Sequence, residues 1–193
     1  MIAPARAAVP AVDDVPAADR HALLAIARDA IVARLARRAY RPPAAAGVLA
    51  EPRGAFVTLR RRDGELRGCI GRMVSEDSLA ETVAEMAAAA ATEDGRFEPV
   101  TEAELPSLVV EISVLGPMRP IRPEDVEVGV HGLMLSCGPR RGVLLPQVPV
   151  EHAWDRETFL DHLCRKAGVP GGAWRRPDCE LLAFTATVFG EED

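Results

Sequence analysis

The stretch GELRGCIGRM, residues 64–73, places a cysteine between glycines and two residues after an arginine. In an extended strand Arg67 and Cys69 face the same side, roughly 6.5–7 Å apart. A cation at that distance favours the thiolate form of cysteine. Gly68 and Gly71 leave the main chain bare, so a ligand or another main chain can come close. The stretch therefore predicts either a nucleophilic or ligand-holding thiolate, or a small buried hydrophobe beside a bulge.

Composition limits what such a thiolate could act on. The chain has 193 residues with a formal net charge of -6, and its pI is near 5.3, so a broad nucleic-acid surface is not expected. No apolar run is long enough to cross a membrane. Residues 1–15 are interrupted by prolines and acids and are expected to form a flexible tail. We predict a cytoplasmic protein without nucleic-acid or membrane partners. Its low lysine and high alanine content is typical of high-GC bacterial genomes.

The other cysteines and the histidines give no metal signature. None of the four cysteines is part of a C-x-x-C pair, so free thiols are expected. His131 and Cys137 lie too far apart in sequence for a tight ligand pair, and His152 and His162 lie farther apart still. Glycine-rich nucleotide-binding loops and the nucleophile elbow of hydrolases are absent from the sequence. The sequence thus predicts no metal and identifies no cofactor.

Hydrophobic spacing indicates the elements that position these residues. Residues 18–40 have a helical apolar stripe with Asp19 as the expected N-cap, ending before Pro42. Ser78 and Glu81 have the spacing of a capping box at the start of a second helix. The other expected elements are a hairpin at 54–71 turning at Asp63–Gly64, a strand at 107–115, a hairpin at 131–148, a helix at 155–168 and one final strand at 181–189.

Helices and hairpins alternate without repeated β-α-β spacing. This predicts an α+β fold with a mixed, antiparallel-rich sheet flanked by helices, rather than a doubly wound sheet.

Six ordered blocks resemble one family. They are FVTL (56–59), LRGCIG (66–71), EDGRFEPV (93–100), EISVL (111–115), VHGL (130–133) and LLPQV (144–148). The chain thereby resembles the AMMECR-type domain family and is similar to its prokaryotic members, the A proteins of the AmmeMemoRadiSam system. The resemblance covers about residues 20–190. It implies one α+β unit, residues 16–190, with a larger and a smaller lobe. It also implies a radical-SAM protein and a Memo-like protein as partners, but no assigned reaction.

The family blocks also contain the polar residues of a hypothetical site. We hypothesise that they converge in one cleft in which Cys69 is a thiolate and His131, oriented by Glu111, is the acid or base. Arg67 or Arg96 would hold a small anionic ligand. The expected ligand contacts are Arg67, Gly68, Gly71, Asp94, Arg96 and Gln147.

Each of these residues also has a structural explanation. Asp94 and Arg96 could form an ion pair that fixes a loop, and His131 could open a hairpin. Gln147, after Pro146, could hydrogen-bond the main chain in an irregular strand. Glycine stands at position 95 where family members commonly have proline, so the geometry of Asp94 and Arg96 is left open. The alternative function is a non-catalytic module that binds a partner, with LRGCIG purely structural.

Overall fold

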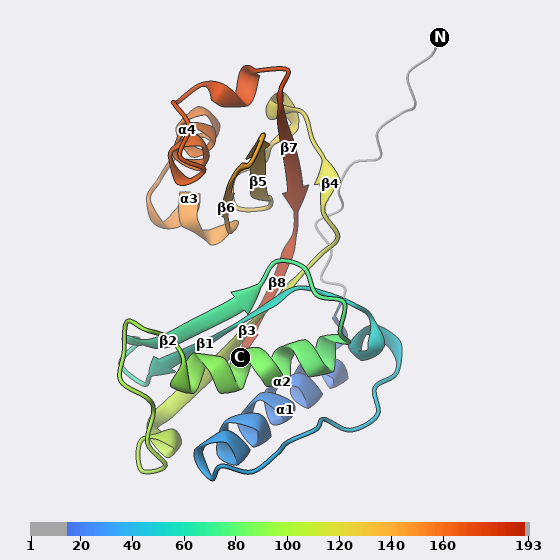
Figure 1. Ribbon diagram of the computed structural model, residues 1–193, viewed down its shortest axis with the longest axis vertical. Helices are drawn as coiled ribbons and strands as arrows, with labels where there is room; N and C mark the ends of the chain where they lie inside the picture. The colour runs from blue at the N-terminus through green and yellow to red at the C-terminus, as the bar shows by residue number, and fades with distance from the viewer. Residues whose placement is uncertain (1–14, 192–193) are drawn as a thin grey trace. The chain divides into compact units, whose positions relative to one another are not determined.

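The computed structural model describes residues 15–191, and its chain divides into two compact units. The larger unit comprises residues 15–115 and 187–191, and the smaller unit comprises residues 116–186. Figure 1 shows the elements of both. The predicted tail, residues 1–15, lies outside the described residues except for Val15, which is fully buried.

The larger unit is an antiparallel sheet with two helices. Its sheet has the strand order β2-β1-β3-β8, and β1 pairs antiparallel with both β2 and β3. The helices and strands are α1 (Ala17–Leu35), β1 (Ala55–Arg61), β2 (Leu66–Arg72), α2 (Leu79–Thr92), β3 (Leu108–Leu115) and β8 (Ala186–Gly190), with short 3-10 helices η1 (Gly47–Ala50) and η2 (Leu105–Ser107).

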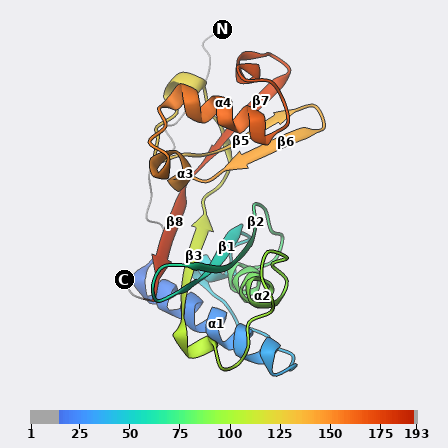
Figure 2. The ribbon, with the colours of Figure 1, turned by 90° about the vertical axis from the view of Figure 1, so that its left-hand side faces the viewer.

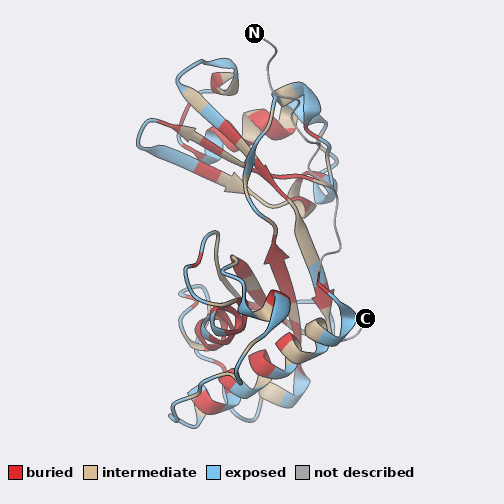
Figure 3. Ribbon diagram, turned by 90° about the vertical axis from the view of Figure 1, so that its right-hand side faces the viewer, coloured by how far each residue is buried: buried red, intermediate tan, exposed pale blue. Residues whose placement is uncertain are grey.

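Both helices lie on the same face of this sheet (Figure 2). That face carries Val57, Leu59, Val110 and Ile112, which are fully buried in a core shared with α1 and α2. Nearly all of α2 is buried, as Figure 3 shows. Because side chains alternate along a strand, the residues between these positions face away from the helices.

The smaller unit has a second four-stranded antiparallel sheet, in the order β4-β7-β5-β6. Phe159, Leu160 and Leu163 of its longer helix are buried in a core with Leu133 and Leu135 of β5. The elements are β4 (Arg119–Pro120), η3 (Pro123–Asp125), β5 (Gly132–Cys137), β6 (Arg140–Leu144), α3 (Gln147–Glu151), α4 (Arg156–Lys166), η4 (Ala173–Arg175) and β7 (Cys179–Phe184).

The predicted α+β class is confirmed, and so is the capping box of α2, where Ser78 and Glu81 bond each other reciprocally. The start and end of α1 differ from the prediction. Pro16 is the N-cap residue and Asp19 lies in the first turn. The helix ends at Leu35, well before Pro42, because Arg37 takes a left-handed conformation with φ 54° and the Arg38 N–H bonds back to the Ala33 carbonyl.

Two further predictions are wrong. The final apolar run is not one strand, because it divides at Thr185 into β7 and β8, which belong to different sheets. Gln147 does not lie in a strand but begins the short helix α3.

The cysteines are not all free thiols. Cys137 and Cys179 face each other across β5 and β7 with their Cα atoms 4.3 Å apart, and they form a disulfide. Cys69 and Cys164 are free.

No helix within residues 15–191 is long and apolar enough to span a bilayer. Across the same residues, no three His, Cys, Asp or Glu side chains gather as metal ligands would.

Candidate functional site

A β-bulge sets the geometry of the LRGCIG segment. Cys69 pairs with Thr58 and Gly68 with Leu59, but the next pair is Leu66 with Arg60, so Arg67 is the extra residue. The Arg67 side chain is buried and does not approach the thiol as the simple alternation predicted. Its Nε and Nη2 donate to the Glu104 carboxylate at 3.2 and 3.3 Å, and its Nη1 donates to the Glu98 carbonyl at 2.9 Å. Arg67 therefore anchors the segment that follows α2.

Glu104 is the acceptor in this anchor. Hydrogen bonds from Arg67, then from the main chain of Thr101, lower its pKa to about 2 despite partial burial. The Thr101 hydroxyl also donates to Glu104, at 3.1 Å. The carboxylate thus holds the bulge and the start of η2 together.

Asp94 and Arg96 close the exposed edge of β2 at Cys69. The Cys69 N–H donates to Asp94 Oδ2 at 2.8 Å, and Arg96 Nη2 donates to the Cys69 carbonyl at 3.4 Å. The two side chains supply the acceptor and the donor that a neighbouring strand would provide. Arg96 also donates from Nε and Nη2 to Asp94, at 2.9 and 2.7 Å. These hydrogen bonds, with that of the Cys69 N–H, hold the Asp94 pKa well below its usual range although burial opposes the shift.

The two glycines of the motif have close neighbours. A Cβ on Gly68 would lie 2.2 Å from the Ala90 carbonyl oxygen of α2, and one on Gly71 would lie 2.2 Å from the Phe56 ring. The space expected for a ligand is therefore occupied by a helix main chain at Gly68 and by an aromatic ring at Gly71. Close packing accounts for both glycines.

The Cys69 thiol lies on the sheet face opposite the helices. Thr58 pairs with Cys69 on one side and with Glu111 on the other, so the three side chains form a row across β2, β1 and β3. The hydroxyl of the buried Thr58 donates to Cys69 Sγ at 3.3 Å, and Cys69 itself is half-buried. Arg96 is more than half exposed, and its Nη1 has no partner among residues 15–191.

His131 and Gln147 belong to the smaller unit, whereas the other predicted site residues belong to the larger one. The Glu127 N–H donates to His131 Nδ1 at 3.0 Å, which fixes the ring from within its own unit. His131 Nε2 and Gln147 Oε1 are buried and have no hydrogen-bond partner in the described part of the chain. Burial lowers the His131 pKa, with Glu127 acting in the opposite direction. The convergence of His131 with Cys69 remains a prediction.

Comparisons with known proteins identify the family of this chain. A family model for AMMECR1 matches residues 24–189. The chain belongs to the AMMECR1 family. Protein MK0488 of Methanopyrus kandleri is 46% identical over 154 residues, 75% of this chain and 74% of that protein. A protein of Aeropyrum pernix is 44% identical over 185 residues, 91% of this chain and 80% of that protein.

A solved structure supports the fold of this AMMECR1 domain. The crystal structure of the uncharacterized protein PH0010 from Pyrococcus horikoshii matches with a TM-score of 0.78 and 40% identity, over 88% of this chain and 90% of that one. These relatives are archaeal and give no support to the bacterial origin suggested by composition.

Two residues of the AMMECR1 domain around Cys69 were missed from sequence, Thr58 and Glu104. A signal existed for Thr58, because a hairpin centred on Asp63–Gly64 pairs position 58 with position 69. No comparable signal existed for Glu104, because its contact with Arg67 depends on how the segment after α2 returns to the sheet.

Proposed function

We propose that this AMMECR1 domain is an enzyme component in which Cys69 acts as a thiolate nucleophile on a small anionic compound. The observation that carries the proposal is the hydrogen bond from the Thr58 hydroxyl to Cys69 Sγ, on a sheet face that neither α1 nor α2 covers. That hydrogen bond fixes the position of the sulfur on this face. A radical-SAM protein and a Memo-like protein are the proposed partners, in line with the family resemblance.

Arg96 is the proposed anion-binding residue. Its Nε and Nη2 are used by Asp94 and by the Cys69 carbonyl, which fixes the guanidinium plane next to Cys69. Its Nη1 stays available, and a guanidinium is a strong donor to carboxylate or phosphate. An anionic group bound there would bring an electrophilic carbon toward the sulfur.

His131 keeps the role of acid or base in this proposal. Burial lowers its pKa, so the ring is neutral at neutral pH. Because Nδ1 accepts a hydrogen bond from the Glu127 N–H, the proton resides on Nε2, and the neutral ring would offer Nε2–H as a hydrogen-bond donor. Glu111, in the same row as Cys69, is the proposed orienting carboxylate.

The test is the rate of alkylation of each free cysteine at neutral pH, followed by mass spectrometry on the full chain. Cys69 should react faster than the thiol of glutathione. The buried Cys164 is an internal reference and should stay unmodified, because burial raises its pKa. Thr58→Val removes the donor while conserving shape and should slow Cys69 several-fold, and Arg96→Gln should also slow it.

Ser113→Ala is the matched control, because Ser113 lies on the same sheet face and pairs with Phe56 rather than with Cys69 or Thr58. It should leave the alkylation rate unchanged. If Cys69 of the folded protein reacts no faster than glutathione, or if Thr58→Val has no effect, the thiolate proposal is refuted.

The second candidate function is a non-catalytic binding module. It is favoured because Arg67, Gly68 and Asp94 already make structural contacts within the larger unit. All three contribute to holding α2 and the segment after it against β2. On this proposal Cys69→Ala would bind the radical-SAM or Memo-like protein with unchanged affinity, measured by calorimetry with purified components. If the single substitution Cys69→Ala abolished binding, the proposal of a binding module would be contradicted.

A further inference from the structure

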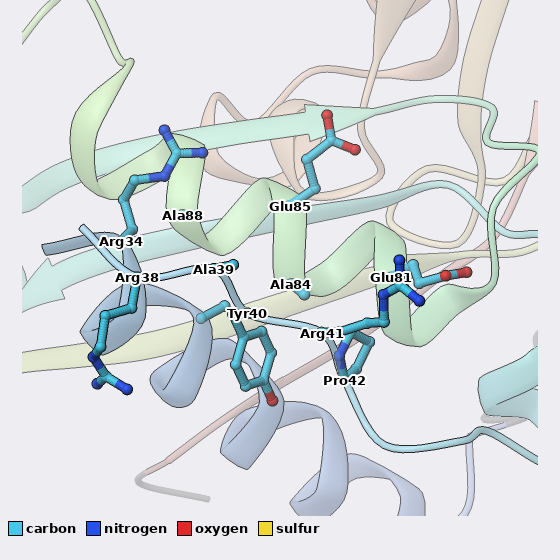
Figure 4. Close-up of a pocket in the computed structure, with 11 residues that line it drawn as sticks. Arg34, Arg38, Ala39, Tyr40, Arg41, Pro42, Glu81, Ala84, Glu85 and Ala88 are labelled. Atoms are coloured by element: carbon cyan, nitrogen blue, oxygen red, sulfur yellow. The ribbon is translucent and has the colours of Figure 1, made fainter. Parts of the chain in front are cut away.

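The larger unit contains a cavity that does not involve Cys69. It has a volume of about 480 Å³ and lies between the end of α1, the segment that follows it, and one side of α2. Figure 4 shows the residues that line it. Cys69 faces away from α2, so this cavity is separate from the proposed thiolate site.

Alanine side chains make this cavity possible. Ala30 of α1 and Ala84 and Ala88 of α2 are nearly fully buried and form its inner wall. Their small size leaves room between the two helices and the segment 38–42. A cavity of this volume is within the range that small-molecule sites occupy.

The rim of the cavity is rich in arginine. Residues 34–41 hold four arginines and no acid, in a chain whose net charge is -6. Arg34, Arg38 and Arg41 line the cavity. The Arg38 side chain has no hydrogen bond or ion pair within residues 15–191. Arg34 bonds Glu93 at 2.6 Å but stays substantially exposed.

The two carboxylates of the cavity are already engaged. Glu85 forms an ion pair with Arg72, and Glu81 accepts hydrogen bonds from Ser78 in the capping box. Those bonds from Ser78 lower the pKa of Glu81, and Arg41 adds to the shift electrostatically. Within residues 15–191, Arg38 has no charge partner and Arg41 has only its electrostatic interaction with Glu81, so the cavity favours an anion.

Tyr40 supplies the aromatic surface of the cavity. It is half-buried and lies between Arg38 and Arg41 in the lining segment (Figure 4). A planar ring can stack on a tyrosine ring, while a phosphate is well matched to a guanidinium. We infer that the cavity binds a nucleoside monophosphate, with the phosphate on Arg38 and the base against Tyr40.

The test uses the fact that Tyr40 is the single tyrosine of the chain. With fluorotyrosine incorporated, ¹⁹F NMR of the full chain gives one resonance, and it reports on this cavity. Adenosine monophosphate should shift the resonance to saturation, and adenosine should bind far more weakly. Arg38→Gln should lower the affinity for adenosine monophosphate about ten- to hundredfold, because it removes a charge-assisted hydrogen bond.

Arg141→Gln is the matched control, because Arg141 is also exposed but lies in the smaller unit. It should leave the affinity unchanged, and circular dichroism of Arg38→Gln should match the wild type. The inference is overturned if millimolar adenosine monophosphate causes no shift, or if Arg38→Gln binds it equally well. If inorganic phosphate binds as tightly as adenosine monophosphate, the assignment of a nucleoside is overturned.

Discussion

Replacing Gly68 with alanine tests whether the motif glycine is there for packing. The new Cβ would lie 2.2 Å from the Ala90 carbonyl oxygen, whereas Cβ contacts below 3.0 Å are essentially never seen, so one main chain must retreat by at least 0.8 Å. Both partners are main chain, in β2 and α2, so no side-chain rotation relieves the clash. Overpacking of this kind costs about 3 kcal/mol at its upper end, and alanine recovers about 0.5–1 kcal/mol by restricting the unfolded chain. The expected net destabilisation is about 2 kcal/mol.

Urea unfolding followed by far-ultraviolet circular dichroism measures this loss. With a urea m-value of about 2 kcal/mol/M, the midpoint should fall by about 1 M. Trp154 and Trp174 both lie in the smaller unit, so their fluorescence follows that unit separately in the same titration. Gly95→Ala is the control, since a Cβ there meets nothing within 4 Å, and its midpoint should stay the same or rise. If Gly68→Ala is as stable as Gly95→Ala, the packing explanation of the motif glycine is refuted.

Three further predictions concern the anchors and the smaller unit. The pKa of Glu104 is lowered from 4.5 to about 2, so its contribution to stability is complete above pH 4.5 and is lost as the pH falls toward 2. Glu104→Gln should remove this acid dependence. It should also lower the free energy of unfolding by about 2 kcal/mol at neutral pH, because the buried Arg67 loses its charge partner. An unchanged dependence of stability on acid pH in urea titrations would contradict this prediction. Burial lowers the His131 pKa below 6.5, so stability should decline as the pH falls through that value and the unfolded chain takes up the proton first. His131→Asn, which keeps an acceptor for the Glu127 N–H, should flatten that part of the tryptophan-monitored profile, and a wild-type slope would refute the reasoning. Reducing the Cys137–Cys179 disulfide, whose cysteines are 42 residues apart, should destabilise the smaller unit by about 4 kcal/mol in the same assay, with Cys137→Ser insensitive to reductant; equal stability with and without reductant would contradict it.

The local elements of the fold were predictable because their signals are short-range. The capping box at Ser78 and the Asp63–Gly64 turn each depend on residues close in sequence, and both are present. The break at Thr185 was not predictable, because β7 and β8 are both apolar and only their different sheets separate them. The Cys137–Cys179 pairing likewise depends on the register of β5 with β7, which spacing along the chain does not give.

The contacts of the candidate site residues were not predictable from the sequence. Arg67 has the residue type that could charge a thiol, yet the bulge turns it to Glu104, because a one-residue insertion breaks the alternation that the prediction assumed. Gly95 left the geometry of Asp94 and Arg96 open, and the structure resolves it as an ion pair that closes the edge of β2.

These contacts separate the structural part of the motif from the part available for chemistry. Asp94 and Arg96 bind the N–H and the carbonyl of Cys69, which any residue other than proline would provide at position 69. Gly68 packs through its lack of a side chain, and Arg67 acts on Glu104. Among residues 15–191, only the hydrogen bond from Thr58 uses the sulfur. A small side chain such as alanine would therefore leave the edge of β2 closed and the fold intact, so Cys69→Ala isolates the thiol. If Cys69→Ala loses a function while its free energy of unfolding equals that of the wild type, that function depends on the sulfur itself and not on the residues that hold it.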